Sequence, residues 1–222
     1  KEKKRQMKRL FGQDSALFRF LQILMNLAIM NVLFLLTSIP VITMGAAYTA
    51  LLSCVFDLLM EEGEFSAKFY YKNFRKIWKP ASAIGTAGFI ILVVLGHHAV
   101  YFFTSESSVR LIAAGFYIAL FIWVFGVMIC QFSVLARKGF WEKAMLKDSA
   151  LLALAKFPVY ILILLLAVSP LTVFMASASF LISMLPVIVL FWIACPAMVC
   201  GWMMKKVLEK IYPELFQKRN EE

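Results

Sequence analysis

Long apolar runs divide this chain, and they constrain its fold more than any other feature. A helix needs about 20 mostly apolar residues to cross the hydrocarbon core of a bilayer. Six runs meet this requirement, with approximate bounds 17–39, 41–60, 81–103, 111–136, 157–175 and 180–203. Only the short segment ASAS separates the last two runs. The sequence therefore predicts an all-α fold, a polytopic six-helix transmembrane bundle that forms one integral membrane domain over residues 1–222.

The composition agrees with a membrane protein. Of the 222 residues, 62% are hydrophobic and 16% are charged, whereas soluble domains have roughly 45–50% apolar and about 25% charged residues. The net charge of +10 could indicate binding to nucleic acid, but that function needs a basic face on a soluble fold. Here the basic residues cluster between apolar runs, so we expect membrane lipids as partners and no nucleic acid.

The positions of Lys and Arg predict the orientation, because positively charged loops stay in the cytoplasm. Six basic residues lie in Lys1–Arg9, and five lie in each of Lys68–Lys79, Arg137–Lys156 and the tail from Lys205. The alternate connections, around Pro40, 104–110 and 176–179, contain only Arg110. With Arg19 at the inner end of the first run, the division is 22 against 1. We expect a cell-membrane protein with cytoplasmic N- and C-termini.

The chain contains little that indicates catalysis. His97 and His98 are its only histidines, and helical neighbours point about 100° apart, so they do not form a metal-binding pair. The motifs GxSxG, HExxH and Walker A are absent from the sequence. All four cysteines fall within predicted spans without a CxxC pair, and we expect buried, inert thiols. The first apolar run is too long for a cleavable signal peptide. The sequence predicts neither an enzyme nor a cofactor.

Small and polar residues in the second run predict close helix packing. Gly45, Thr49, Ser53 and Asp57 recur every four residues. Such a small-residue face lets two helix backbones approach closely in lipid. We expect runs one and two to form a tight antiparallel hairpin that turns near Pro40, with this face setting the distance between them.

Polar residues in the first run predict a surface turned away from lipid. Arg19, Gln22, Asn26 and Thr37 fall in an arc of about 60° on a helical wheel. Intramembrane polar groups mark a bundle interior or a solute pathway. Helix packing is the main interpretation, and a path for a solute or ion is the alternative. Arg19 and Asp57 lie at similar depths in the expected hairpin, and we predict an ion pair between them.

The segment after the second run predicts an amphipathic cytoplasmic helix between spans two and three. Its basic face is Lys68, Lys72, Arg75, Lys76 and Lys79, and its opposite side carries Tyr70, Tyr71, Phe74, Ile77 and Trp78. Such a helix lies at the headgroup boundary. Membrane anchoring is one interpretation, and docking of a partner is the other. The later basic segment repeats the pattern less clearly, with Trp141 and Lys143 as candidate docking residues.

Two stretches carry a resemblance to a known family. LFGQDSALFRFLQILMNLAIMNVLFLLTSIPVITMGAAYTAL resembles the first hairpin of the YesL-like bacterial integral membrane proteins, notably at Phe18–Phe20, Asn31 and Leu36–Ala46. QFSVLARKGFWEKAMLKDSALLALAKFP is similar to that family's central segment. The resemblance implies a six-span protein of Gram-positive bacteria, commonly encoded beside carbohydrate ABC importers. It implies no catalytic residue.

Two functions remain open from these observations. We expect a non-enzymatic accessory protein that associates with the permease of an oligosaccharide ABC importer. The alternative is a stand-alone sugar or small-solute transporter, for which Pro170, Pro186 and Pro196 provide candidate helix breaks. Residues 142–150 are similar to the ATPase-coupling loop of importer permeases but lack its glycine, so the chain is not expected to be the permease itself. A homo-oligomer is compatible with either function.

Overall fold

The computed structural model describes residues 16–60, 66–106, 108–176 and 193–215. In order, the elements are α2 (Ala16–Thr37), η1 (Val41–Thr43), α3 (Met44–Met60), α4 (Ala67–Thr104), α5 (Arg110–Lys138), α6 (Lys143–Ala155), α7 (Phe157–Ala176), α9 (Ala194–Ile211) and η2 (Pro213–Leu215). This part of the chain contains helices and no strands, which confirms the all-α prediction.

Local sequence signals explain where several helices begin and end. The hydroxyl oxygen of Ser66 accepts a hydrogen bond from the backbone N–H of Lys68, as expected of an N-cap residue. Gly139 adopts a left-handed conformation with φ of 72° directly after α5, which is a common way for a helix to end. Asn31, 0% exposed on α2, accepts hydrogen bonds from the N–H groups of Ile193 and Ala194 at 3.1 and 3.0 Å. One helix thus caps the start of another that is remote in sequence.

Helix α4 differs from the prediction of a separate cytoplasmic helix before the third span. It runs for 38 residues and continues through Pro80. A proline inside a helix removes one backbone hydrogen bond. The N-terminal half of α4 is nevertheless held in place because Tyr70 and Ile77 are buried in the protein core. The basic segment and the third apolar run are therefore one helix.

Three described helical segments are long and apolar enough to cross a membrane: Val41–Met60, α4 and α5. A fourth span results if α6 and the first half of α7, which meet at 87°, count as one broken segment. Within the described ranges, the structure thus supports a membrane protein with three or four candidate spans. Part of the predicted sixth run, residues 180–192, lies outside the described residues, and α9 continues beyond its predicted end to Ile211.

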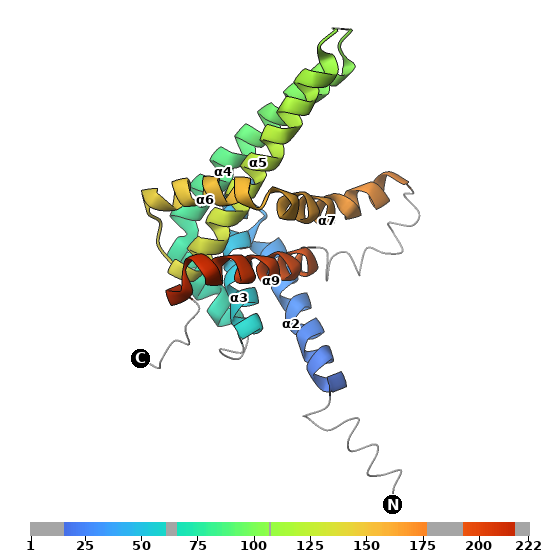
Figure 1. The fold of residues 1–222 in the computed structure, drawn as a ribbon. Helices are drawn as coiled ribbons and strands as arrows, with labels where there is room; N and C mark the ends of the chain where they lie inside the picture. Colours follow the sequence, from blue (N-terminus) through green and yellow to red (C-terminus); the bar gives the residue numbers. More distant parts are fainter. Residues whose placement is uncertain (1–15, 61–65, 107, 177–192, 216–222) are drawn as a thin grey trace, which may run out of the picture.

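The helices are not arranged as parallel spans. Helices α4 and α5 form a long hairpin whose tip extends away from the other elements, while α6 and α9 run across its base (Figure 1). A Cβ atom on Gly45, at the start of α3, would lie 3.0 Å from the Cα of Gly85 in α4. Gly85 is about 29 Å from Thr104 along the α4 axis, which is about one hydrocarbon thickness. The turn near Pro40 therefore lies beside the middle of α4. It was predicted to lie on the same side of the membrane as the 104–110 connection, but the two are not at the same level along α4.

Candidate functional site

The buried and exposed sides of the N-terminal half of α4 differ from the predicted faces. Tyr70 and Ile77 are buried, whereas Tyr71 and Trp78 are 55% and 45% exposed. The wheel grouped these residues on one aromatic side, but the structure divides that side between the core and the surface. Phe74 is partly buried, and its role as a docking residue stays a prediction.

The exposed aromatic residues lie beside exposed cations. The guanidinium of Arg75 lies 6.0 Å from the ring centroid of Tyr71, and Nζ of Lys79 lies 5.9 Å from that of Trp78. These distances are at the outer limit of cation–π contact. We call Tyr71, Arg75, Trp78 and Lys79 the basic–aromatic stripe. Three more predicted docking residues, Lys68, Lys72 and Lys76, are also exposed.

Tyr70 connects this segment to the first hairpin. Its hydroxyl lies 2.7 Å from Oγ1 of Thr37 and donates to the carbonyl oxygen of Ala47 at 3.2 Å. Thr37 is next to the turn that was predicted to be outside the membrane, whereas Tyr70 belongs to the segment predicted to be inside. Two groups in hydrogen-bond contact cannot lie on opposite sides of a bilayer, so the predicted placement of these two segments is wrong. Hydropathy indicates helix length but not the angle at which helices cross.

Polar residues predicted to line the bundle have different environments. Gln22 is exposed and Asn26 is partly exposed, so the predicted polar arc is not wholly turned inward. Asn31 caps α9. The side chain of Arg19 lies outside the described part of the structure, and the predicted Arg19–Asp57 pair is therefore not described. Asp57 instead accepts a hydrogen bond at 3.1 Å from Arg137 of α5, whose side chain is only 7% exposed.

The small-residue face of α3 packs on α4 and α5, which corrects the predicted contact with the first run. Gly45 meets α4, as described above. Thr49 donates to the Gly45 carbonyl at 2.7 Å, within α3 itself. Ser53 donates at 3.0 Å to the carbonyl oxygen of Ala136 in α5. The small side chains therefore bring α3 close to the α4–α5 hairpin.

Charged residues from five helices gather at the base of this hairpin. Asp57 pairs with Arg137, the side chain of Lys76 lies over Gly139, and Lys205 of α9 donates to the carbonyl oxygen of Leu59 at 3.2 Å. We call this region the polar end; it comprises Asp57, Lys76, Arg137, Lys138, Glu142, Asp148, Lys205 and Tyr212. Arg110, at the opposite end of α5, is remote from it. The basic segments after spans two and four and before the C-terminus are thus brought together.

Helices α6 and α9 meet within the polar end. Lys138 lies 3.4 Å from Glu142 and 5.1 Å from the ring centroid of Tyr212. The Tyr212 hydroxyl donates to a carboxylate oxygen of Asp148. Burial, followed by this contact and nearby acidic groups, raises the pKa of Tyr212 to about 12. The predicted docking residues Trp141 and Lys143, just before and at the start of α6, are both exposed.

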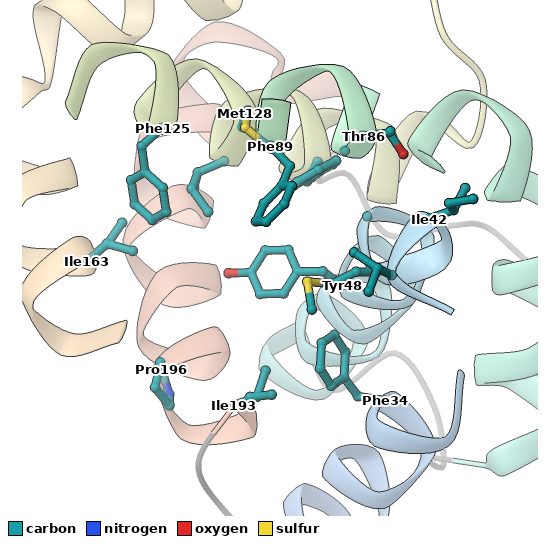
Figure 2. A pocket seen from close by; sticks show the side chains of 16 residues that line it. Phe34, Ile42, Tyr48, Thr86, Phe89, Phe125, Met128, Ile163, Ile193 and Pro196 are labelled. Atoms are coloured by element: carbon teal, nitrogen blue, oxygen red, sulfur yellow. The ribbon is translucent and has the colours of Figure 1, made fainter. Parts of the chain in front are cut away.

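A cavity of about 280 Å³ lies beside the Gly45–Gly85 contact, and both glycines line it. This cavity was not predicted from the sequence. The ring of Tyr48 projects into it, facing Phe34, Phe89, Phe125 and residues of α7 and α9 (Figure 2). Nearly all lining groups are apolar, the polar exceptions being Tyr48 and Thr86. We call this space the Tyr48 cavity.

The cysteines and histidines lie in different environments. Cys54, Cys130 and Cys200 are buried as expected, but Cys195 is exposed on α9. Cys130 Sγ lies 2.7 Å from the hydroxyl of Tyr160. The ring of His98 stacks on Tyr117 at 5.2 Å. Among the described residues, no group of three or more acidic, cysteine or histidine side chains is placed to hold a metal ion.

Comparison with known proteins gives a match to a family model. Residues 27–97 match the model of a family described as "Protein of unknown function, DUF624", which is the family shared by YesL-like proteins. This region covers the second half of α2, all of α3, and α4 as far as His97. No curated protein and no solved structure matched the chain.

Proposed function

We propose that this chain is a multi-pass protein of the bacterial cell membrane that acts as a non-enzymatic accessory to a carbohydrate ABC importer. In this proposal the α4–α5 hairpin crosses the bilayer, and the polar end and both termini lie in the cytoplasm. The carbohydrate assignment rests on the resemblance to YesL-like proteins. The proposed partner is the importer's permease, and self-association is compatible with the same role.

One observation carries the accessory role: exposed cations and aromatic rings lie on α4 and at the start of α6, two helices that also contribute Lys76 and Asp148 to the polar end. Lys68, Lys72 and the basic–aromatic stripe are exposed on α4, and Trp141 and Lys143 are exposed next to α6. Aromatic and arginine side chains are common anchors in protein interfaces. Asp57–Arg137 connects α3 to α5, and Tyr212–Asp148 connects the end of α9 to α6, so side-chain contacts hold these helices together.

A stand-alone transporter remains the second candidate, and the Tyr48 cavity is the feature that favours it. Sugar binding needs several polar groups that form hydrogen bonds with hydroxyls. The cavity lining offers Tyr48 and Thr86 only. Pro196 lies in the first turn of α9, where it does not break the helix. The side chain of Pro170 and all of Pro186 lie outside the described residues. These features favour the accessory role.

Affinity purification of the full chain from its native membranes tests the proposal. In mild detergent, importer permease or ATPase subunits should co-purify with the unaltered chain and be identified by mass spectrometry. Lys72→Glu should reduce their recovery, whereas Arg110→Glu, an equal charge change at the far end of the hairpin, should not. Recovery of no importer subunit, together with sugar uptake by the purified chain in liposomes, would favour the transporter instead.

A further inference from the structure

The basic–aromatic stripe and the Tyr48 cavity lie along one side of α4. At about 100° per residue, the stripe residues and the lining residues Gly85, Thr86 and Phe89 fall within an arc of about 120°. The stripe occupies the turns before and around Pro80, and the lining residues occupy the turns after it. Ser82 and Gly85, which lie between the stripe and the cavity on this side, are buried, whereas Ala83 is exposed. A ligand that passes beside the two buried residues, along Ala83, would contact cations at one end and the cavity at the other.

The cavity opens to the surface of the protein. Ile42 on η1 and Phe89 on α4 both line it, and they are 64% and 51% exposed. Exposed apolar residues continue from Phe89 along α4 through Ile90, Val93 and Val94. The opening is thus continuous with an apolar helix surface of the kind that faces lipid.

The spacing matches one leaflet of a bilayer. Lys79 and Phe89 are ten residues apart, which is about 15 Å along the helix axis. Half of a hydrocarbon core of about 30 Å has the same thickness. If Lys79 lies at the headgroup level, the cavity lies at the depth of the acyl chains. Tyr71 and Trp78 have the aromatic character that is enriched at this boundary.

The charges at the outer end favour an anionic headgroup. Arg75 and Lys79 are both exposed, one helical turn apart, and within the described part of the chain neither pairs with a carboxylate. Guanidinium and ammonium groups bind phosphate through charge-assisted hydrogen bonds. The apolar lining requires the remainder of the ligand to be hydrocarbon.

We propose that one anionic glycerophospholipid binds here, with its phosphate against Arg75 and Lys79 and one acyl chain in the Tyr48 cavity. This lipid would fill the space among α3, α4, α5 and α9 beside the Gly45–Gly85 contact. The proposal does not depend on the partner or substrate of the chain. It requires only that α4 enters the membrane near Lys79.

Native mass spectrometry of the purified full chain, with added phosphatidylglycerol or phosphatidylcholine of equal chain length, tests this proposal. The chain should retain one phosphatidylglycerol molecule in preference to phosphatidylcholine. Arg75→Gln with Lys79→Gln should weaken this binding about 30-fold, from the loss of two cation–lipid attractions. The control Lys147→Gln with Lys156→Gln removes the same charge at exposed positions in and directly after α6 and should leave the affinity unchanged.

A second variant tests the acyl chain. Ile42→Trp places a large side chain at the exposed mouth of the cavity, where it need not disturb the core. It should weaken binding of long-chain phosphatidylglycerol about tenfold or more, because one or two methylene groups of the acyl chain lose their burial. Binding of a dihexanoyl analogue should be unchanged. Equal weakening in the α6 control, or equal retention of phosphatidylcholine, would overturn the proposal. So would full displacement of the lipid by inorganic phosphate, which would assign the cations to a free anion.

Discussion

Gly45 of α3 and Gly85 of α4 meet backbone to backbone. A Cβ atom on Gly45 would lie 2.4 Å from the carbonyl oxygen of Ala81, and one on Gly85 would lie 2.9 Å from the Cα of Gly45. Neither contact can be relieved by rotating a side chain. The first hairpin is therefore held against α4 by two positions that tolerate only glycine.

We predict that Gly85→Ala destabilises the protein by about 1–3 kcal/mol, because the added methyl group forces the helices apart. The measurement is the thermal transition of the detergent-purified protein. Gly115→Ala is the matched control, since a Cβ there has no neighbour within 4 Å. It should be neutral or stabilising by about 0.5–1 kcal/mol. Equal thermal transition temperatures for the two variants would contradict the close contact between Gly45 and Gly85.

Asn31→Ala should destabilise the packing of α9 on α2. The substitution removes the acceptor for two N–H groups at the start of α9, and loss of a helix cap costs about 1–2 kcal/mol. Hydrogen exchange should increase in the first turn of α9 before the rest of the protein. Gln22 carries an exposed side-chain amide on the same helix as Asn31. Gln22→Ala is therefore the control and should change stability by less than about 0.5 kcal/mol.

Asp57→Asn should destabilise the protein more than Glu209→Gln does, although both substitutions change a carboxylate into the matching amide. Asp57 pairs with the nearly buried Arg137, whereas Glu209 is 43% exposed and lies 3.7 Å from Lys205. We expect a loss of about 2 kcal/mol for Asp57→Asn, between the values for exposed and buried pairs, and less than about 1 kcal/mol for Glu209→Gln. Chemical unfolding in mixed micelles measures both. Equal losses would show that the pair with Arg137 is unimportant.

Tyr212 should ionise at higher pH than an ordinary tyrosine. Burial and the contact with Asp148 raise its pKa to about 12, against about 10 in an unfolded chain. The raised pKa means that neutral Tyr212 stabilises the fold below about pH 10, and that this stabilisation disappears as the pH rises through about 12. The difference in tyrosinate absorbance between the unaltered chain and Tyr212→Phe measures the pKa. Asp148→Asn should lower it, and an unchanged value would contradict the assigned contact.

Sequence patterns predicted the helices better than their contacts. The long apolar runs correspond to α2 to α5, because hydrophobic length is a local property. The helical wheel also identified the basic residues of α4. It did not separate Tyr70, which enters the core, from Tyr71, which is exposed, because a wheel shows angles and not the elements that pack on each side.

Contacts between residues remote in sequence were beyond prediction. Asn31 and Ala194 are joined only after the chain folds, and nothing near either residue indicates the other. Arg137 was interpreted as part of a positively charged loop, although it reaches Asp57 of α3. The Tyr48 cavity results from the crossing of α3 and α4 at Gly45 and Gly85, and Gly85 carries no signal that distinguishes it from the other glycines of this helix.

The central claim is that the α4–α5 hairpin crosses the membrane with the polar end in the cytoplasm, and cysteine labelling in intact cells tests it most directly. Cys195, the exposed native cysteine among the described residues, is first replaced by serine. Single cysteines are then introduced as Ser108→Cys at the hairpin tip or Lys143→Cys at the start of α6, both exposed positions. A membrane-impermeant maleimide should label Ser108→Cys in intact cells and Lys143→Cys only after permeabilisation. Labelling of both variants in intact cells, or of neither, would contradict the account.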